Sequence, residues 1–345
     1  MDRMIAVRKI KSAPGFELSE VEVPTPGKND LLVEVQACSM CGTDIHIYNW
    51  EPPWSTGRFI PPKTIGHEVC GKIIDKGSSV NGFDIGDLVS AESHIYCGEC
   101  DQCKAGNGHI CRNLKFFSID TDGFFAKYAI IPVQNAWKSN GMKPEIATLQ
   151  ESMGNSVYTV MAQDVKDKDV VVSGCGPTGL FAIGIAKALG AGRIFAIAGT
   201  ELHMSIAKKM HADRVVDRHK EDPLKVIMDE TENKGADVVL EMSGAEPALQ
   251  TALKVVKPTG FVTVLGLPTK DITIDVSKMI VLKNLTFRGI YGRKIWDTWK
   301  MTSHLLNSGL NIEPIITHRL KLEDFEQGIA AMKSGQCGKV VMFPK

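Results

Sequence analysis

The sequence has little that would direct the protein to a nucleic acid or to a membrane. Its 345 residues include 40 basic and 40 acidic side chains, so the formal net charge is zero. No excess of charge therefore favours binding to a polyanion or an anionic lipid surface. The N-terminal segment lacks the apolar core of a signal peptide, and the most apolar stretch, residues 180–199, is broken by Lys187 and Arg193. These absences predict a cytoplasmic protein with neither a nucleic-acid nor a membrane partner.

Internal repeats and low-complexity tracts are also lacking. The chain is 43% hydrophobic, which is typical of a folded globular protein, and its length suits about two domains. Because no export signal is present, the nine cysteines are predicted to be thiols or metal ligands and not a disulfide framework.

The apolar pattern changes near residue 155. Before it, β-branched runs such as residues 31–39 end at turn residues, which predicts a compact β-rich domain over residues 1–155. After it, apolar strands alternate with helical segments, beginning with residues 169–191, which predicts a doubly wound parallel sheet over residues 156–292. Residues 293–345 mix helix-like and extended pieces and are expected to return to the first domain. The predicted fold class is α/β.

A glycine motif lies where the first parallel strand should meet its helix. Gly174, Gly176 and Gly179 fit the pattern G-x-G-x-x-G. The first glycine permits a tight turn, the second lets the backbone approach a pyrophosphate, and the third allows close helix–strand packing. The helix N-terminus, which begins near Pro177 and Thr178, attracts the phosphate charge. A glycine triplet alone also occurs in ordinary turns, but this strand–helix context predicts a dinucleotide site.

The sequence lacks the acidic residue that binds the adenosine ribose of NAD about 20 residues after the glycines. The second predicted strand ends at Ala198, and the first carboxylate after it belongs to Glu201. Without an acid at that position a 2′-phosphate meets less charge repulsion. Thr200 can donate a hydrogen bond, and His203 or Arg218 can add positive charge. We therefore expect NADP in preference to NAD, while an NAD enzyme that uses Glu201 stays open.

Four cysteines share one short segment with the spacing C-x2-C-x2-C-x7-C; they are Cys97, Cys100, Cys103 and Cys111. Four thiolates on one loop suit a closed tetrahedral zinc site, which stabilises a segment with little core of its own. An iron–sulfur run typically has three residues before its last cysteine and a proline after it. Here the last gap is longer and Arg112 follows, so a structural zinc ion is predicted.

A second set of possible ligands is dispersed along the chain and consists of Cys41, His67 and Glu68. Each residue alone is weak evidence, because a single cysteine or histidine is more often structural. Together they offer a thiolate, an imidazole and a carboxylate. Three protein ligands with an open fourth position is the arrangement of a catalytic zinc ion. The neighbouring Cys38 and Cys70 are interpreted as packing residues.

In this order the motifs resemble the zinc-containing medium-chain alcohol dehydrogenases over essentially the whole chain. Within that family they are most similar to the branch that oxidises threonine. The segments that carry this resemblance are residues 41–50 (CGTDIHIYNW), 66–68 (GHE), 154–159 (GNSVYT), 240–248 (LEMSGAEPA), 289–293 (GIYGR), 316–319 (ITHR) and 333–340 (KSGQCGKV). The resemblance implies a GroES-like catalytic domain, a Rossmann domain and a homotetramer.

The resemblance also implies roles for individual residues. The dispersed set would bind a catalytic zinc ion and the four cysteines a structural one, which gives two zinc ions per subunit. Thr43 and His46 match the proton relay of the family, Glu151 matches a carboxylate near the metal, and His94 matches a histidine near the substrate. The cofactor-binding positions are Gly174, Gly176, Pro177, Thr178, Gly179, Ala198, Gly199, Thr200, His203, Leu265, Gly266, Leu267, Ile290 and Tyr291.

The implied reaction is the zinc-dependent oxidation of a secondary alcohol by hydride transfer to a nicotinamide, with L-threonine giving 2-amino-3-oxobutanoate. Two departures near the expected zinc site leave a polyol or a butanediol-like alcohol open as the substrate. Ser152 and Met153 replace a pair that usually contains proline, and Tyr158 stands where threonine-oxidising members commonly have histidine. A non-catalytic dinucleotide-binding protein should lack a metal ligand or a relay residue, and a zinc-free quinone reductase should lack both metal sets, whereas this chain has them all.

Overall fold

The computed structural model describes residues 3–52, 55 and 57–345. Met1 and Asp2, the start of the segment considered above for an export signal, lie outside the described residues. The chain forms two compact units, one of Met1–Ser152 with Ile316–Lys345 and one of Met153–Ile315. The α/β class is confirmed, with one unit built mainly from short strands and one built around a parallel sheet with helices.

The first unit is built mainly from short strands. The strands are β1 (Arg3–Lys9), β2 (Glu17–Glu22), β3 (Asp30–Ser39), β4 (Lys63–Thr64), β5 (Glu68–Lys76), β6 (Leu88–Ala91), β7 (His94–Ile95), β8 (Lys115–Phe116), β9 (Tyr128–Pro132), β10 (Ala136–Lys138), β17 (Ile316–Lys321) and β18 (Lys339–Phe343). The helices are α1 (Gly42–Asn49), α2 (Asp101–Lys104), α3 (Pro144–Ala147), the start of α4 (Gln150–Val160), α10 (Phe325–Lys333) and the 3₁₀ turns η2 (Gly108–Ile110), η3 (Val133–Asn135) and η6 (Leu322–Asp324).

These strands form three sheets. One has the order β2-β1-β4, a seven-stranded sheet has the order β10-β6-β5-β3-β18-β17 with β9 also paired to β3, and β7 pairs with β8. Strand β3 is mostly buried because β5, β9 and β18 all pair with it. Its register places Ser39 opposite Glu68. The end of β3, and with it Cys41, is therefore held beside the start of β5.

The second unit carries a six-stranded parallel sheet with the order β13-β12-β11-β14-β15-β16. Its strands are β11 (Asp169–Ser173), β12 (Arg193–Ala198), β13 (Arg214–Asp217), β14 (Ala236–Glu241), β15 (Val256–Val264) and β16 (Thr286–Gly289). Its helices are the remainder of α4, α5 (Pro177–Ala188), α6 (Glu201–Lys209), α7 (Pro223–Glu230), α8 (Glu246–Val255), α9 (Asp297–Asn307), the π-helical turn η4 (Ser277–Val281) and the 3₁₀ turn η5 (Glu313–Ile315).

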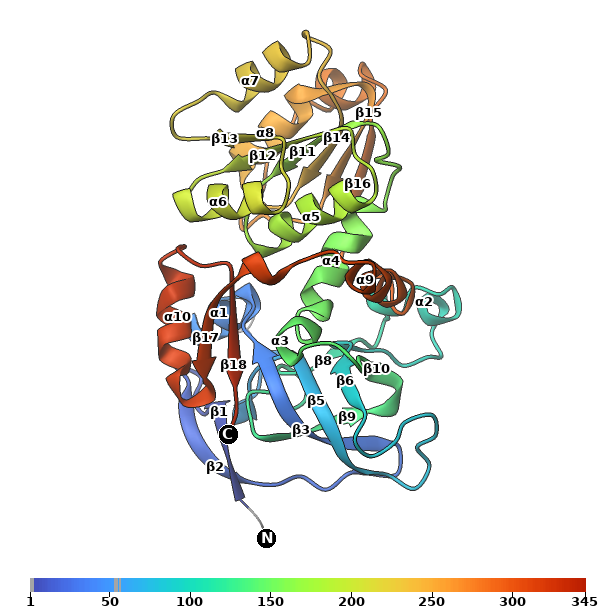
Figure 1. Ribbon diagram of the computed structural model, residues 1–345, viewed down its shortest axis with the longest axis vertical. Helices are drawn as coiled ribbons and strands as arrows, with labels where there is room; N and C mark the ends of the chain where they lie inside the picture. The colour runs from blue at the N-terminus through green and yellow to red at the C-terminus, as the bar shows by residue number, and fades with distance from the viewer. Residues whose placement is uncertain (1–2, 53–54, 56) are drawn as a thin grey trace. The chain divides into compact units, whose positions relative to one another are not determined.

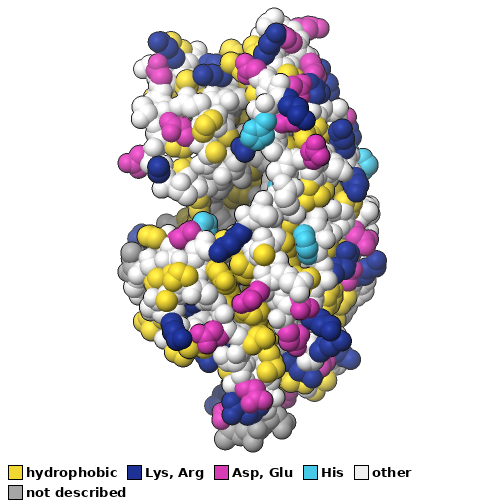
Figure 2. Space-filling view, turned by 90° about the vertical axis from the view of Figure 1, so that its left-hand side faces the viewer, with side chains coloured by type: hydrophobic (Ala, Val, Ile, Leu, Met, Phe, Trp, Pro, Cys, Tyr) yellow, Lys and Arg dark blue, Asp and Glu magenta, His cyan; other side chains and the backbone are white. Residues whose placement is uncertain are grey.

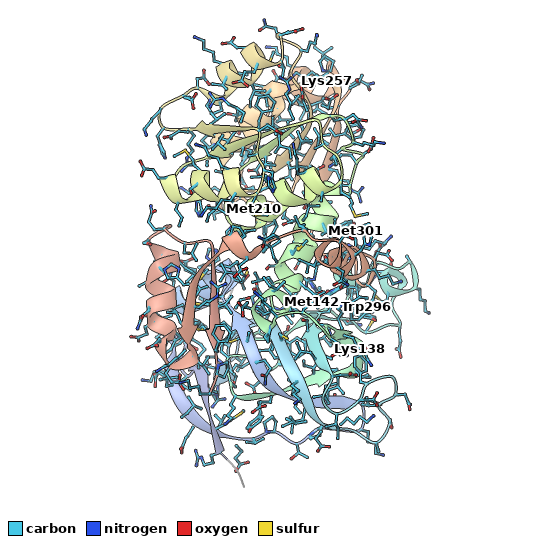
Figure 3. All side chains as sticks on the ribbon, in the orientation of Figure 1. Lys138, Met142, Met210, Lys257, Trp296 and Met301 are labelled. Carbon is cyan, nitrogen blue, oxygen red and sulfur yellow. The ribbon has the colours of Figure 1, made fainter. Side chains whose placement is uncertain are left out.

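Helices cover both faces of the parallel sheet. Figure 1 shows α5 and α6 on one side of it and α7 and α8 on the other. The central strands are continuous apolar runs because both of their faces are buried, as in the fully buried Val170, Val171 and Val172 of β11. Helix α5 approaches its neighbours closely at Gly184, where an added Cβ would lie 2.5 Å from Cε of Met210. Met210 is labelled at the end of α6 in Figure 3.

The two crossings between the units lie at residues 152/153 and 315/316. The first is close to the predicted boundary at 155, whereas the return to the first unit comes later than the predicted 293. The reason is local packing. Arg293 donates a hydrogen bond of 3.0 Å to Asn155, and its side chain lies against Gly154, so the segment that leads into α9 stays with the second unit.

The exterior shows no segregation of charge on the face drawn in Figure 2, where basic and acidic side chains are interspersed. Within the part of the chain that the structure describes, no helix combines the length and the apolar character needed to cross a membrane.

Candidate metal and cofactor sites

The four cysteines of the 97–111 segment converge. Their sulfur atoms are 3.4 Å apart between Cys97 and Cys111, 3.5 Å between Cys100 and Cys103, 3.8 Å between Cys100 and Cys111 and 4.0 Å between Cys97 and Cys103. A tetrahedral zinc site with Zn–S bonds of about 2.3 Å requires sulfur atoms roughly 3.8 Å apart. The observed separations bracket that value, so the donor set fits zinc.

Backbone groups prepare this loop for an anionic sulfur. The amides of Arg112 and Cys103 hydrogen-bond to the Cys100 thiol and lower its pKa to about 6. Cys100 also caps α2, while Arg112 binds Asp101 of that helix through hydrogen bonds of 2.5 and 2.7 Å. Since a thiolate is the form that binds metal, the fold favours the ligand form of at least this cysteine.

The dispersed set converges as well. One donor atom each of Cys41, His67 and Glu68 lies within 4.8 Å of the others. Gly66, just before the histidine, has a φ of 93°, and a Cβ there would lie 2.1 Å from the ring of Phe125. Only glycine therefore allows the chain to turn into β5 at this point. The turn and the β3–β5 register together deliver the histidine and the carboxylate to the thiol.

The histidine of this set has a buried carboxylate beside it. Oδ1 of Asp44 lies 3.7 Å from Nδ1 of His67, and Oδ2 of Asp44 accepts a hydrogen bond of 2.8 Å from the Cys41 amide. Burial alone would lower the pKa of His67, but Asp44 and Cys41 outweigh it and raise the pKa to about 10. A metal binds the neutral ring, so metal uptake here would displace a proton.

The carboxylate of Glu68 is embedded in polar contacts that the sequence analysis missed. Lys339 of β18 donates 2.7 Å to Oε1 of Glu68 and 2.8 Å to the carbonyl of Met40, and Ser39 donates to the other carboxylate oxygen. Burial raises the pKa of Glu68, and the charge of Lys339 opposes that rise. The signal in the sequence was a single lysine at the start of the apolar run KVVMF.

The predicted relay residues lie on α1. Oγ1 of Thr43 is 4.0 Å from Sγ of Cys41. His46 is half-exposed and its Nδ1 lies 2.6 Å from Oε2 of Glu51, a carboxylate that the sequence analysis did not single out. Hydrogen bonds from His46 and Asn49 lower the pKa of Glu51.

Glu151 and His94 lie among buried polar groups of the first unit. Glu151 accepts a hydrogen bond from Ser93, and its charge raises the pKa of both Asp44 and Glu68, which places it near the dispersed set. His94 is 5% exposed, with its Nδ1 2.7 Å from Glu92.

Of the three residues that depart from the family pattern near the expected zinc site, two are buried and the third is partly buried. Ser152 is buried and donates to the carbonyl of Leu149, and Met153 is part of the core. Tyr158 lies against the guanidinium of Arg288, 5.7 Å from the ring centre. Cys38 and Cys70 are fully buried, as their interpretation as packing residues predicted.

The glycine turn has the expected geometry. Gly174 adopts a φ of 99°, and a Cβ on Gly179 would lie 1.9 Å from the carbonyl oxygen of Gly174. Gly176 caps α5 and Pro177 opens it. A Cβ on Gly176 would meet no protein atom within 4 Å. Its lack of a side chain therefore leaves room for another molecule to approach the helix N-terminus.

The remaining cofactor candidates follow other parallel strands. Ala198 ends β12, Gly199 follows, and Thr200 caps α6 by accepting a hydrogen bond of 3.2 Å from the His203 amide. The other candidates, Leu265, Gly266 and Leu267 after β15 and Ile290 and Tyr291 after β16, also follow strand ends. The predicted positions thus share the carboxyl edge of the sheet, where ligands of such folds bind.

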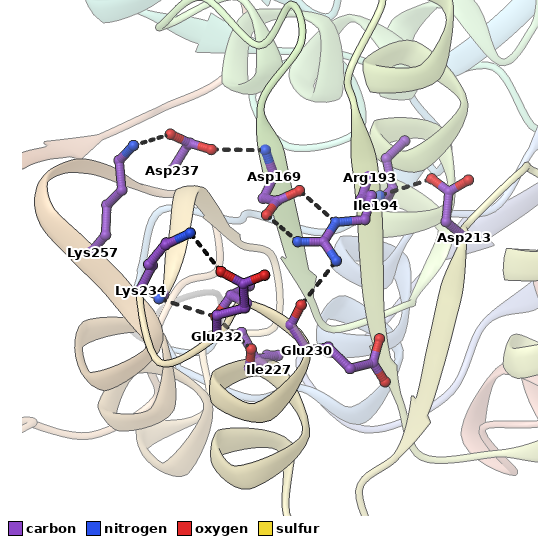
Figure 4. Close-up of polar contacts among 12 residues, drawn as sticks. Asp169, Arg193, Ile194, Asp213, Ile227, Glu230, Glu232, Lys234, Asp237 and Lys257 are labelled. Atoms are coloured by element: carbon purple, nitrogen blue, oxygen red, sulfur yellow. Dashed lines mark hydrogen bonds and ion pairs between the residues drawn. The ribbon is translucent and has the colours of Figure 1, made fainter.

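A separate cavity of about 680 Å³ lies at the opposite edge. It is lined by the first residues of β11 and β12 and by charged side chains that pair with one another (Figure 4). Arg193 binds Asp169 at 2.6 Å, Lys234 binds Glu232 at 2.7 Å, and Lys257 binds Asp237. These mutual pairs and the distance along β11 from the glycine turn separate this cavity from the cofactor positions.

Two family models match the chain. Residues 27–141 match the alcohol dehydrogenase GroES-like domain, and residues 177–308 match the zinc-binding dehydrogenase. Over its whole length the chain is 46% identical to an L-threonine 3-dehydrogenase from Pyrococcus horikoshii, of which it covers 99%.

Solved structures of dehydrogenases are similar to this chain in fold. A protein described as a zinc-binding dehydrogenase from Sinorhizobium meliloti, bound to NADP, has a TM-score of 0.92 and 27% identity, with both chains covered completely. The 2R,3R-butanediol dehydrogenase from Bacillus subtilis has a TM-score of 0.89 and 25% identity over 99% of this chain and 100% of its own.

Proposed function

Because this chain belongs to the zinc-binding dehydrogenases with an alcohol dehydrogenase GroES-like domain, we propose that it is an L-threonine 3-dehydrogenase. It would oxidise the secondary hydroxyl of L-threonine to the ketone of 2-amino-3-oxobutanoate. The observation that carries this proposal is the convergence of Cys41, His67 and Glu68 within 4.8 Å, in a chain 46% identical over its full length to a relative of that name.

Two zinc ions per subunit fit the donor sets. Cys97, Cys100, Cys103 and Cys111 would hold one in a closed structural site, and Cys41, His67 and Glu68 would hold the other with a position open to substrate. When bound at the open site, zinc supplies Lewis acidity that lowers the pKa of a coordinated hydroxyl. Glu151 lies near enough to this set to act on its charge, as its effect on the pKa of Glu68 indicates.

The glycine turn of Gly174, Gly176 and Gly179 would hold the pyrophosphate of a nicotinamide dinucleotide, which when bound would supply the hydride acceptor for the oxidation. We favour NADP over NAD, because Ala198 offers no carboxylate to the ribose. The likeness to the NADP-bound Sinorhizobium meliloti structure supports the same preference.

Residues of α1 would carry away the proton of the substrate hydroxyl. Thr43 lies beside Cys41 and its hydroxyl can both accept and donate. His46 is one turn further along the same helix face and half-exposed, so it can pass a proton to solvent. Its bond to Glu51 fixes the ring through Nδ1. Oxidation of the carbinol releases one hydride equivalent and one proton, and Thr43 and His46 would deliver that proton to water.

Assembly and location complete the proposal. We expect a homotetramer, which the family resemblance favours, and a cytoplasmic location, as the sequence analysis predicts.

A second candidate is the oxidation of a polyol or a butanediol. The structural likeness to 2R,3R-butanediol dehydrogenase favours it, and the metal ligands would be the same. The burial of Ser152 and Met153 counts against it, because these departures from the family pattern lie in the packed interior.

The test is an initial-rate assay of zinc-loaded full-length protein with L-threonine, sorbitol and 2,3-butanediol, each with NAD and NADP. Turnover of L-threonine is the expected result, with mass spectrometry detecting either a product two hydrogens lighter or the amino ketone that this β-keto acid leaves when it loses CO2. Faster turnover of sorbitol or butanediol at matched concentration would overturn the threonine assignment in favour of the second candidate.

A further inference from the structure

Arg218 follows β13 directly, and the sheet places it beside the end of β12. Strand β13 pairs with β12 so that Asp217 lies opposite Ala198, and the Arg218 amide donates 3.0 Å to the carbonyl of Ala198. The arginine is thereby anchored by its backbone at the carboxyl edge of the sheet. That edge is where an adenosine ribose would lie in a fold of this kind.

The Arg218 side chain lies directly over Gly199. A Cβ added to Gly199 would lie 2.5 Å from Nε of Arg218 and 3.0 Å from both Cζ and Nη2. Any larger residue at position 199 would therefore displace the guanidinium. The absence of a side chain at Gly199 thus leaves room for the planar guanidinium of Arg218 beside the end of β12.

Arg218 differs from the other arginines of this sheet in its partners. Arg193 is bound by both oxygens of Asp169, and Arg214 is bound by Glu221 and Glu230. Within residues 3–52, 55 and 57–345, the structure gives Arg218 no ion pair with a carboxylate, and its Nε makes a long contact of 3.4 Å with His219. Its charge is therefore available to an external anion.

Two further groups at this edge suit an anion. Oγ1 of Thr200 accepts the amide hydrogen bond of His203, so its own proton can be donated elsewhere. Ala198 supplies no carboxylate that would repel a phosphate or neutralise the arginine. After Ala198 the next carboxylate along the chain belongs to Glu201, which is exposed in the first turn of α6. Across the strand pair Asp217 lies opposite Ala198, and its two oxygens are bound by the His219 amide at 3.0 Å and by Lys220 at 3.3 Å.

We propose that Arg218, which lies against Gly199, binds the 2′-phosphate of NADP and sets the preference for the phosphorylated cofactor. The inference rests on the proposed use of a nicotinamide cofactor but not on the identity of the alcohol. The ligand chemistry is a phosphomonoester on a ribose, for which the forked guanidinium provides two parallel hydrogen bonds.

The test measures binding and not turnover. Full-length zinc-loaded protein is titrated with NADPH and NADH by fluorescence, and with 2′,5′-ADP and 5′-AMP by calorimetry. The variants are Arg218→Gln, Arg218→Lys and, as a matched control, Lys220→Gln, which removes an exposed positive charge two residues away that pairs with Asp217.

We expect the wild type and Lys220→Gln to bind 2′,5′-ADP more tightly than 5′-AMP. Arg218→Gln should lose that preference by about 10- to 100-fold while its NADH affinity stays the same, as loss of a charged hydrogen-bond pair implies. Arg218→Lys should retain part of it, because it keeps the charge but not the fork.

Equal binding of the two fragments by the wild type, or full preference in Arg218→Gln, would overturn the inference. If neither dinucleotide binds, the inference and the proposed cofactor fail together. If Arg218→Gln loses the preference but L-threonine is not oxidised, the inference holds and only the substrate assignment fails.

Discussion

Nζ of Lys339 lies 2.7 Å from Oε1 of Glu68, and both side chains are almost completely buried. The pair joins the last strand of the chain to the start of β5. It also compensates the charge of a carboxylate that we propose as a zinc ligand. A zinc ion and Lys339 would therefore both neutralise Glu68, and each should make the other less necessary.

The first prediction concerns Lys339→Met. Without zinc, removal of the lysine leaves a buried uncompensated carboxylate, which should lower the free energy of unfolding by about 3–5 kcal/mol. With zinc bound the loss should be clearly smaller, because the metal supplies the missing positive charge. Urea denaturation with added zinc and after chelation measures both values.

A surface pair provides the control for this variant. Lys187 and Asp213 are each 39% exposed, so Lys187→Met should change stability by less than about 1 kcal/mol whether or not zinc is present. Equal losses for Lys339→Met with and without zinc would show that Glu68 does not share its charge with the metal.

The second prediction concerns the four-cysteine segment. Cys103→Ser should remove one zinc ion per chain and loosen the segment from 97 to 111, because a shared metal would tie Cys97 and Cys111 at its two ends together. Metal analysis should give half the zinc of the wild type, and limited proteolysis should cut within this segment first. Cys70→Ala, which alters a cysteine buried in the core, should keep both zinc ions. Undiminished zinc in Cys103→Ser would contradict the structural site.

The contrast between these two sites shows how much the sequence could reveal. The four cysteines are local, so their spacing alone predicted the cluster. The glycine turn is also local, and the close approach of Gly179 to Gly174 follows from the strand–helix motif. The pairing of Lys339 with Glu68 depends on how β18 joins β3, which no local pattern encodes. A single lysine in an apolar run predicts that its side chain is buried, but it does not indicate which residue will pair with it.

The chain returns to the first unit at residue 316 and not at the predicted 293. This difference also depends on contacts between segments that are distant in sequence. The segment after residue 293 reads as helix and short extended pieces in either unit. Its place is decided by tertiary contacts of Arg293 with Gly154 and Asn155, which are distant in sequence.

The third prediction concerns the pH dependence of stability through Lys9. This side chain is fully buried and donates to the carbonyls of Ala13, Gly15 and Tyr48, and burial lowers its pKa to about 8. The unfolded chain keeps the ordinary value near 10.5. Between these two values the unfolded state binds more protons than the folded state, so stability should rise with pH.

Lys9→Met removes this titration. Across pH 8 to 10 the wild type should gain on the order of 1–3 kcal/mol relative to this variant, measured by denaturant unfolding at each pH. Lys11→Met, which alters an exposed lysine, should track the wild type. Parallel pH profiles for the wild type and Lys9→Met would mean that Lys9 titrates as an ordinary lysine.

The last prediction separates chemistry from folding at the dispersed metal set. Cys41 is at the N-cap of α1, and its backbone amide donates a hydrogen bond of 2.8 Å to Oδ2 of Asp44. Cys41→Ser therefore preserves the helix start while it replaces the thiolate donor with a hydroxyl.

For Cys41→Ser we expect kcat for the best alcohol to fall by at least on the order of 10³-fold, since a Lewis acid supplies several kcal/mol of transition-state stabilisation. NADPH affinity should not change, because the predicted cofactor positions belong to the unit of Met153–Ile315, which does not contain Cys41. Cys38→Ala, three residues earlier and buried in the core, should keep its turnover. If Cys41→Ser loses one zinc ion yet turns over at the wild-type rate, the thiol does not hold a catalytic metal, and the oxidation must depend on other groups.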